Sequence, residues 1–266
     1  MHTAFDQIAS SYDETFTHTE VGKRQRNIVW GYLERTLPLN KLLDILELNC
    51  GTGEDALFLA KRGNRVTATD VSEEMLNTAN RKIVENGLEK SVHTEKISIE
   101  ELSGSTFKKK FDLVFSNFGG LNCIDEGVLG ELSDEFKLLL NANGRIIIVL
   151  MPRFCLWESI YFLSKFKLNE SIRRLNTEYT TAKVGESDVK TYYHSPATII
   201  KKFSNNFIVR NIIPVGFFIP PSYLNSFFIK KKKTLNFLTR LEKGSSNIPI
   251  LSKAADHFLI DMVLKG

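Results

Sequence analysis

A glycine-containing turn is the first stretch of the sequence whose residues predict a binding site for a nucleotide-like ligand. Residues 51–56 (GTGEDA) follow an apolar run and fit the pattern G-x-G-x-x-A. In dinucleotide-binding sites this pattern joins a strand to a helix, and its glycines let the backbone approach the ligand closely. Asp70 lies 19 residues after Gly51, a spacing typical of the carboxylate that binds ribose hydroxyls.

Three carboxylates around the turn restrict which ligand it can hold. Glu47 stands just before the turn, and Glu54 and Asp55 begin the segment that follows it. One carboxylate about 6 Å from a phosphate, at an effective dielectric constant of ~20, costs roughly 3 kcal/mol. A pyrophosphate is therefore disfavoured. The same carboxylates would attract S-adenosylmethionine, because it carries a positive ammonium and a positive sulfonium. A P-loop is excluded because the turn lacks the lysine of G-x-x-x-x-G-K-[ST].

The elements that must position these residues alternate between apolar strands and amphipathic helices up to residue 151. The predicted strands are 42–48, 65–69, 92–97, 111–116 and 145–151, and the predicted helices are 4–36 with a bend, 55–62, 72–85 and 128–140. This alternation predicts an α/β fold with a doubly wound, mostly parallel sheet and helices on both faces. Ligands of such sheets lie beyond the carboxyl ends of the strands, where the turn, Asp70 and Asn117 fall.

The pattern changes after residue 152. Residues 154–175 are helical and mixed, 178–194 predict a hairpin, 196–205 a helix, and 207–218 and 258–264 two strands that bring the sheet to seven. We expect three parts. They are N-terminal helices and a cofactor-binding core over 1–152, a lid and substrate insertion over 153–195, and completion of the core sheet over 196–266, with a basic helical insertion at 219–255.

Composition excludes several classes of protein. The net charge of the 266 residues is only +4, and the positive charge is concentrated in residues 219–243, with six basic residues and one acid. Three widely spaced cysteines favour neither a disulfide framework nor a zinc site, and no metal is expected. The N-terminus lacks a leader-like apolar segment and no apolar run reaches 18 residues, so we expect a cytoplasmic protein without a transmembrane segment. A weak contact with an anionic surface is expected through Lys230, Lys231, Lys232 and Lys233.

Together these stretches resemble the class I S-adenosylmethionine-dependent methyltransferases. ELNCGTG followed by VTATDVS is similar to their D/E-x-G-x-G-x-G pattern with an acid closing the second strand, and FDLVFSNFGGLN looks like their fourth-strand motif. The opening AFDQIASSYD is similar to the lead-in of the small-molecule branch that includes ubiquinone and menaquinone methyltransferases. The resemblance covers residues 5–151, with 207–218 and 258–264 fitting the last strand pair. It implies a Rossmann-like fold and transfer of a methyl group to an O, N or C atom of a small molecule. The motif of DNA base methylation, [DNS]-P-P-[YFW], is absent after the fourth strand, so no DNA partner is expected.

The resemblance also implies a set of cofactor contacts. Glu47 would face the ammonium of S-adenosylmethionine, Asp70 its ribose hydroxyls and Arg26 its carboxylate. The full implied set is Tyr12, Arg26, Glu47, Asn49, Cys50, Gly51, Gly53, Asp70, Val71, Met75, Ser98, Ile99, Asn117 and Phe118. Two positions depart from the family pattern. Asn49 replaces its first glycine, although asparagine tolerates left-handed backbone, and Ser98 stands where an aspartate is common.

The residues that act on the acceptor are less well marked. His18 and His194 are the candidates for a general base, and Arg153, Trp157 and Tyr193 for acceptor contacts. Two other functions remain open on the sequence. One is an NAD(P)-dependent oxidoreductase of the same topology. The other is a non-catalytic protein that retains the cofactor fold.

Overall fold

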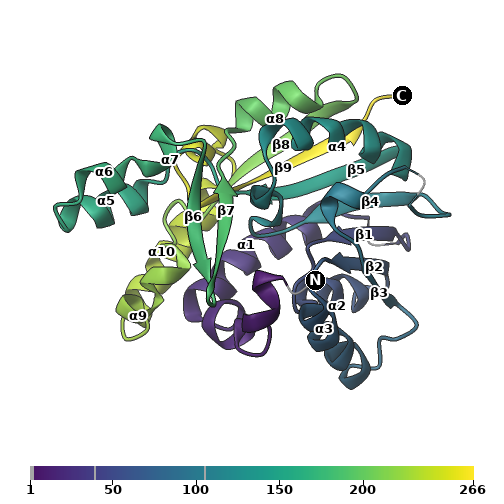
Figure 1. Cartoon of the computed structure of the whole chain (residues 1–266), viewed down its shortest axis with the longest axis horizontal. Helices are drawn as coiled ribbons and strands as arrows, with labels where there is room; N and C mark the ends of the chain where they lie inside the picture. The colour runs from purple at the N-terminus through teal and green to yellow at the C-terminus, as the bar shows by residue number, and fades with distance from the viewer. Residues whose placement is uncertain (1–2, 39, 105) are drawn as a thin grey trace.

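The central element is a seven-stranded sheet that places the glycine turn at the carboxyl ends of its strands. The structure is a computed structural model that describes residues 3–38, 40–104 and 106–266. The strands are β1 (Asp44–Leu48), β2 (Arg65–Asp70), β3 (Val92–Lys96), β4 (Phe111–Ser116), β5 (Leu140–Leu150), β8 (Phe207–Val215) and β9 (His257–Leu264). Their order is β3-β2-β1-β4-β5-β9-β8 (Figure 1). The pairs β5–β9 and β9–β8 are antiparallel and the other four pairs are parallel, so the sheet is mostly parallel, as predicted.

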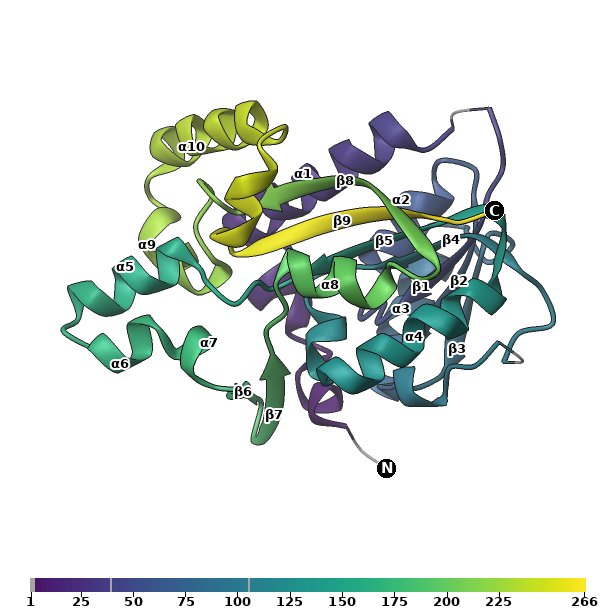
Figure 2. The same ribbon diagram turned by 90° about the horizontal axis from the view of Figure 1, so that it is seen from above.

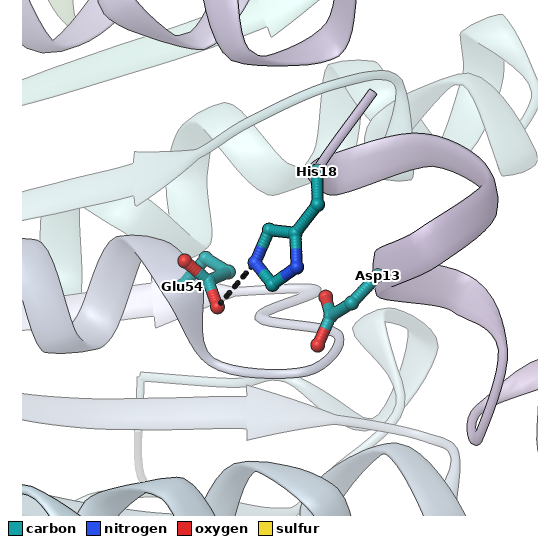
Figure 3. A group of neighbouring side chains, drawn as sticks. All are labelled: Asp13, His18 and Glu54. Carbon is teal, nitrogen blue, oxygen red and sulfur yellow. Dashed lines mark ion pairs between the residues drawn. The ribbon is translucent and has the colours of Figure 1, made fainter. Parts of the chain in front are cut away.

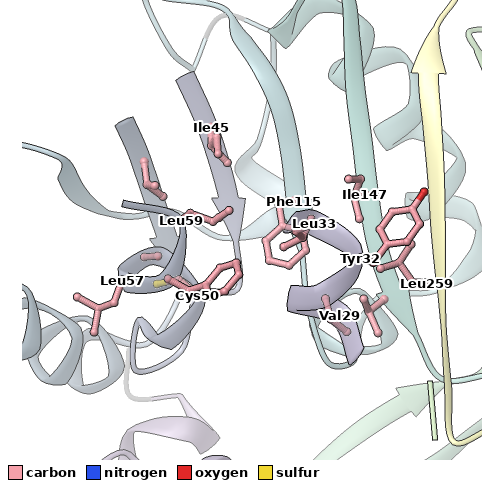
Figure 4. Close-up of a cluster of buried hydrophobic side chains, with 14 of the residues drawn as sticks. Val29, Tyr32, Leu33, Ile45, Cys50, Leu57, Leu59, Phe115, Ile147 and Leu259 are labelled. Carbon is pink, nitrogen blue, oxygen red and sulfur yellow. The ribbon is translucent and has the colours of Figure 1, made fainter. Parts of the chain in front are cut away.

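Helices cover both faces of this sheet because alternate strand residues point to opposite sides. On one face Ile45 and Phe115 pack against α1 (Glu20–Thr36), α2 (Glu54–Ala60) and α3 (Glu73–Glu85), and Figure 4 shows part of this cluster. On the other face Leu46 and Val114 pack against α4 (Glu126–Leu139) and α8 (Pro196–Phe203). Figure 2 shows the two helical layers on either side of the sheet. The arrangement is the doubly wound, Rossmann-like fold expected from the sequence.

Side-chain caps fix where the helices near the site begin. The Thr19 hydroxyl accepts the Gly22 N–H at the start of α1, and the Ser72 hydroxyl accepts the Met75 N–H at the start of α3. An unpaired N–H at a helix start is stabilised by such a cap by about 1 kcal/mol. Ser72, predicted as the start of this helix, is therefore the cap that precedes α3.

The predicted start of the fifth strand at residue 145 was wrong. β5 begins at Leu140, directly after α4, and residues 141–144, predicted to separate helix and strand, belong to it. Leu140 pairs with Phe111, and a register shift then restores regular pairing from Leu113 with Arg145 onward. A bulge absorbs the extra residues, because one strand can carry more residues than its partner at an irregularity.

Residues 153–195 project from the carboxyl-end side of the sheet as short helices followed by a hairpin. The helices are α5 (Leu156–Ser164), α6 (Leu168–Ser171) and α7 (Arg173–Asn176), and the hairpin is β6 (Tyr179–Val184) with β7 (Ser187–Tyr192). The hairpin tip reaches the N-terminal segment (Figure 1). There the Gln7 side chain accepts the Glu186 N–H and donates to Ser187 Oγ. The N-terminal segment consists of a 3-10 helix, Ala4–Ile8, and a π-helical turn, Asp13–Thr17.

The basic insertion between β8 and β9 contains α9 (Asn225–Phe228) and α10 (Lys232–Ser245). Its only acid, Glu242, is buried and accepts four backbone N–H groups, those of residues 216–219. This anchors the insertion to the end of β8 while its lysines stay exposed. Across the three described ranges, every helix is too short or too polar to cross a lipid bilayer.

Candidate functional site

A pocket opens at the carboxyl ends of β1, β2 and β4 and is covered from one side by the N-terminal segment. Its position is the one that ligands occupy in doubly wound sheets. The lining residues are Phe5, Tyr12, Arg26, Asn49, Cys50, Gly51, Thr52, Glu54, Asp55, Asp70, Val71, Met75, Asn117, Phe118, Gly119, Gly120 and Cys123. Ten of them are among the predicted cofactor contacts.

The turn after β1 has the backbone conformation that its glycines permit. Gly51 and Gly53 have positive φ values of 54° and 79°, and Asn49 has a φ of 53°. Asparagine thus occupies the left-handed region that a glycine would otherwise fill. At Gly53 a β-carbon would also lie 2.9 Å from Ala79 Cβ, so only glycine lets α2 approach α3 this closely.

Asp70 ends β2 and points its carboxylate at the turn. Its Oδ2 accepts the Gly51 N–H at 2.8 Å, and its Oδ1 accepts the Ser72 N–H at 2.9 Å. Burial raises the pKa of Asp70, while the hydrogen bonds from Ser72 and Gly51 act in the opposite direction. A carboxylate has about four acceptor positions, so Asp70 keeps capacity for hydroxyl donors in the pocket.

Glu47 lies behind the turn and is the unpaired acid of the site. It is 2% exposed, and its Oε2 has no hydrogen-bond partner in the described part of the chain. Burial, followed by the nearby negative charge of Asp55, raises the pKa of Glu47 well above its usual value. An enclosed carboxyl oxygen without a partner is costly, and a cationic ligand group would remove that cost.

The other two acids at the turn are paired within the protein. Asp55 accepts from Arg26 in a buried ion pair and also from Asn117 Nδ2 at 3.0 Å. Glu54 lies 2.7 Å from Lys82 Nζ. The sequence argument treated Glu54 and Asp55 as unbalanced charges, which was wrong because their cations come from distant segments. Of the three acids that the sequence argument used, Glu47 is therefore the one without a cationic partner among the described residues.

The N-terminal segment is tied to the turn through Asp13. Asp13 Oδ1 accepts from the Thr52 hydroxyl at 2.6 Å, and its carboxylate also pairs with Lys82. Asp6 Oδ1 accepts from the Ser72 hydroxyl at 2.6 Å, which fixes the segment to the start of α3. Tyr12 lies in this segment, and burial raises its pKa to about 12, so its hydroxyl stays neutral beside the pocket.

Asp13, His18 and Glu54 form a cluster at the pocket mouth whose ligand atoms lie within 4.8 Å of one another (Figure 3). His18 Nε2 is 3.5 Å from Glu54 Oε1. The Lys82 ammonium contacts both carboxylates of this cluster. It already supplies the positive charge that a metal ion would bring, so the cluster is a set of ion pairs that holds the N-terminal segment.

Comparison with known proteins agrees with this geometry. The family described as "Methyltransferase domain" matches residues 45–144. A demethylmenaquinone methyltransferase of Clavibacter sepedonicus is 31% identical over 147 residues, 54% of this chain and 55% of the relative. The chain thus spans about half the length of that relative. A demethylmenaquinone methyltransferase of Bacteroides fragilis is 27% identical over 226 residues, 80% of this chain and 82% of the relative.

Residues 45–144 thus match a methyltransferase domain, and the chain is similar to S-adenosylmethionine-dependent methyltransferases. A solved S-adenosylmethionine-dependent methyltransferase from Listeria monocytogenes shares the fold, with a TM-score of 0.58 at 19% identity over 89% of this chain and 96% of that one. The comparisons agree with S-adenosylmethionine as the cofactor, and they give no support to the nicotinamide-dependent oxidoreductase.

The residues of the pocket fit S-adenosylmethionine. The orphaned Glu47 carboxyl matches an ammonium, and the open positions on Asp70 match vicinal ribose hydroxyls. The Arg26 Nε is enclosed without a partner although its Nη1 pairs with Asp55, so Arg26 retains a donor for a carboxylate. Burial raises the pKa of the Cys50 thiol well above its usual value, which keeps it neutral next to the turn.

Several predicted residues lie outside the lining of the pocket. Gly53 and Glu47 stand behind the turn, Ser98 caps a 3-10 helix (Ile99–Glu101), and Ile99 packs in the core. None of the three expected acceptor contacts lines the pocket. They are Arg153, which donates to the Leu175 carbonyl, Trp157, which donates to the Phe217 carbonyl, and Tyr193, whose hydroxyl meets Thr180 Oγ1. His194 is buried just after the hairpin. His18 contacts the lining residue Glu54 but does not line the pocket itself, so the role of either histidine as a base stays a prediction.

Other lining residues were not predicted. Thr52, Glu54 and Asp55 belong to the turn itself and its following helix, so their position was available in the sequence. Gly119, Gly120 and Cys123 follow the fourth strand. Phe5 has no local signal, because its place in the pocket depends on how the N-terminal segment folds back.

Proposed function

We propose that the chain transfers a methyl group from S-adenosylmethionine to a small-molecule acceptor. The observation that carries the proposal is the unpartnered, buried Glu47 carboxyl beside a turn whose opposite end presents Asp70. S-adenosylmethionine carries a cationic amino-acid part and a ribose, which suit these two carboxyl groups. The relatives named above act on demethylmenaquinone, which supports an apolar, ring-containing acceptor for this chain.

In this proposal each part of the pocket holds one part of the cofactor. Glu47 faces the ammonium, Arg26 the carboxylate and Asp70 the ribose hydroxyls. Val71 and Met75 flank the adenine, and Asn117 with Phe118 lines the methyl-bearing end. When bound, the cofactor supplies a methyl group made electrophilic by its sulfonium. The protein then has to orient the acceptor atom in line with that methyl group and exclude water.

The cover of the site is proposed to consist of two layers. The N-terminal segment lies directly on the pocket through Phe5 and Tyr12. The insertion 153–195, expected as the lid, contacts that segment through its hairpin and does not line the pocket. We therefore propose that the insertion acts through the N-terminal segment, which it holds closed.

A weak contact of the basic insertion with an anionic surface is proposed separately. Lys230, Lys231, Lys232 and Lys233 are all exposed, and Phe227 and Ile229 beside them are 59% and 46% exposed. Apolar side chains next to lysines suit the headgroup region of an anionic bilayer. Co-sedimentation with anionic but not zwitterionic vesicles tests it, and binding that persists after substitution of all four lysines by glutamine contradicts it. A cytoplasmic location remains the expectation.

Calorimetry with S-adenosylhomocysteine and with NADH tests the cofactor assignment. Binding of S-adenosylhomocysteine and none of NADH is expected, and tight binding of NADH alone contradicts the proposal. Incubation of the protein with cell extract and radiolabelled S-adenosylmethionine tests the transfer. Labelled small molecules support it, whereas cofactor binding without any labelled product favours a non-catalytic protein.

A further inference from the structure

A buried aspartate and histidine lie on the side of the sheet from which an acceptor has to approach. β9 runs antiparallel to β5, and Leu150 at the end of β5 pairs with Phe258. The first residue of β9, His257, is therefore at the ligand-binding edge of the sheet. The proposed cofactor residues lie mainly at the ends of β1 and β2, with Asn117 and Phe118 after β4, which leaves the side of β5 and β9 for the acceptor.

His257 contacts a residue that lines the pocket. The His257 ring stands nearly perpendicular to the Phe118 ring, with 5.4 Å between the ring centroids, and Phe118 lines the pocket. Phe16 packs on the same Phe118 ring at 5.7 Å, and Tyr12 packs on Phe16 at 5.5 Å. The surroundings of the methyl-bearing end on this side are therefore largely aromatic.

Asp256 is held as a carboxylate next to this histidine. Gln25 Nε2 donates to its Oδ2 at 3.1 Å, and Arg174 Nη2 lies 3.5 Å from its Oδ1. Burial acts to raise the pKa of Asp256, but His257, Arg174 and Gln25 outweigh it and lower the pKa to about 2. Asp256 is 5% exposed, so its charge acts on His257 with little screening.

The two ring nitrogens of His257 have different surroundings. Nδ1 is enclosed and lies 3.3 Å from Asp256 Oδ2, close but not aligned for a hydrogen bond. Nε2 also has no hydrogen-bond partner in the described ranges, but unlike Nδ1 it is not fully enclosed. A carboxylate beside Nδ1 favours the tautomer with its proton there, which leaves Nε2 free to accept a proton.

We propose that His257, oriented by Asp256, accepts the proton of the methyl acceptor, and that the acceptor is an aromatic compound with a phenol-type hydroxyl. The inference rests on the proposed function and names the substrate class of the same site. A neutral imidazole can assist the loss of a phenolic proton, whose pKa is about 10, whereas an aliphatic hydroxyl is too weakly acidic. The phenolic oxygen bonds to the methyl carbon, the methyl–sulfur bond breaks with its electron pair on sulfur, and the hydroxyl proton passes to Nε2.

A matched pair of probes tests recognition of the hydroxyl without turnover. 2-Naphthol and 2-methoxynaphthalene share one ring system, but only the first has an O–H group. On protein saturated with S-adenosylhomocysteine, 2-naphthol is expected to bind about tenfold more tightly, corresponding to one hydrogen bond of ~1.4 kcal/mol. His257→Ala is expected to abolish that preference. Failure of both probes to bind, equal binding of both, or a preference that survives in His257→Ala overturns the inference.

A rate measurement tests the role of the proton transfer. With 2-naphthol and labelled S-adenosylmethionine, His257→Ala is expected to lower kcat by about 100-fold or more, and added imidazole is expected to restore part of it. Asp256→Asn is expected to lower kcat with an unchanged KM for S-adenosylmethionine. The exposed His93 provides the control His93→Gln, which should keep the wild-type rate. A wild-type rate in His257→Ala overturns the inference, and if 2-naphthol is not methylated the binding comparison decides.

S-Adenosylhomocysteine affinity separates this inference from the function on which it rests. If the wild-type protein does not bind S-adenosylhomocysteine, the proposed function fails. If His257→Ala binds it as tightly as the wild type and also keeps the preference for 2-naphthol, only the role of His257 fails. His257→Gln, which keeps a side chain of similar size, is measured beside His257→Ala, with thermal unfolding as the check on folding.

Discussion

The side chain of Asn49 fills the space that Gly120 leaves open across the pocket. A β-carbon on Gly120 would lie 2.4 Å from Asn49 Cβ and 2.7 Å from Asn49 Oδ1, closer than atoms can approach without displacement. The asparagine that replaces the first glycine of the family pattern is therefore accommodated by a glycine on the loop after β4. The two positions form one packing unit, although 71 residues separate them.

A double-mutant cycle tests this packing. Gly120→Ala is expected to lower the free energy of unfolding by ~1–3 kcal/mol, the usual cost of overpacking. Adding Asn49→Gly is expected to recover most of the loss, because the side chain in conflict is then absent. Urea titration of the two single variants and the double variant measures the coupling. Gly244→Ala, where no atom lies within 4 Å, is the control. Purely additive effects of Asn49→Gly and Gly120→Ala would contradict the contact.

The raised pKa of Glu47 predicts how the stability of the ligand-free protein depends on pH. The folded protein holds the proton at pH values where the unfolded chain, with a pKa near 4.5, has lost it. The contribution of this group to stability is therefore fully present below the unfolded pKa and decreases as pH rises toward the folded pKa. In urea titrations Glu47→Gln is expected to remove that decrease and to be more stable than the wild type at neutral pH. A wild-type pH dependence in Glu47→Gln would contradict the assignment.

The same group predicts a proton released on cofactor binding. An ammonium placed beside Glu47 favours its ionised form, so S-adenosylhomocysteine binding at neutral pH is expected to release a proton to the buffer. Calorimetry in buffers of different ionisation enthalpy detects it as a change in the observed binding enthalpy. Glu47→Gln should show no such buffer dependence and should bind more weakly.

Asp70 is expected to determine much of the cofactor affinity. Asp70→Ala removes the acceptor proposed for the ribose hydroxyls and also the hydrogen bond to the Gly51 N–H. We expect at least tenfold weaker binding of S-adenosylhomocysteine, about 1.4 kcal/mol or more, measured by calorimetry. Glu89→Gln, an exposed acid away from the pocket, is the control. An unchanged dissociation constant for Asp70→Ala would refute the assignment.

The link between Asp13 and Lys82 predicts an effect on the rate of ligand release. Asp13→Ala breaks the contacts with Lys82 and with the Thr52 hydroxyl, so the N-terminal segment should open more readily. We expect S-adenosylhomocysteine to dissociate several-fold faster in stopped-flow measurements, with an association rate close to that of the wild type. Lys96→Gln, which removes an exposed pair with Glu73, should leave the dissociation rate unchanged.

The parts of the fold and site that follow from local patterns were predictable from the sequence. Alternating apolar strands and capped helices gave the doubly wound sheet, and the spacing of Gly51 and Asp70 placed the pocket. The left-handed conformation of Asn49 also agreed with expectation. Each of these depends on neighbouring residues or on one strand–turn–helix unit.

The parts that depend on distant contacts were not predictable. Arg26 neutralises Asp55 from a helix 29 residues earlier, and Phe5 reaches the pocket because Asp6 and Gln7 bind two other elements. Nothing near His257 in the sequence distinguishes it from a core residue of a final strand. Its neighbours at the site, Phe118 and Asp256, come together only when β9 inserts between β5 and β8.

The contacts of the N-terminal segment on two sides have a consequence for the order of events in a catalytic cycle. The segment is fastened to the glycine turn at Asp13 and to the hairpin at Gln7. A ligand lying beneath the segment is expected to leave only after its contacts through Asp13, Asp6 and Gln7 have opened. We therefore expect the spent donor to be the last ligand to leave in each cycle.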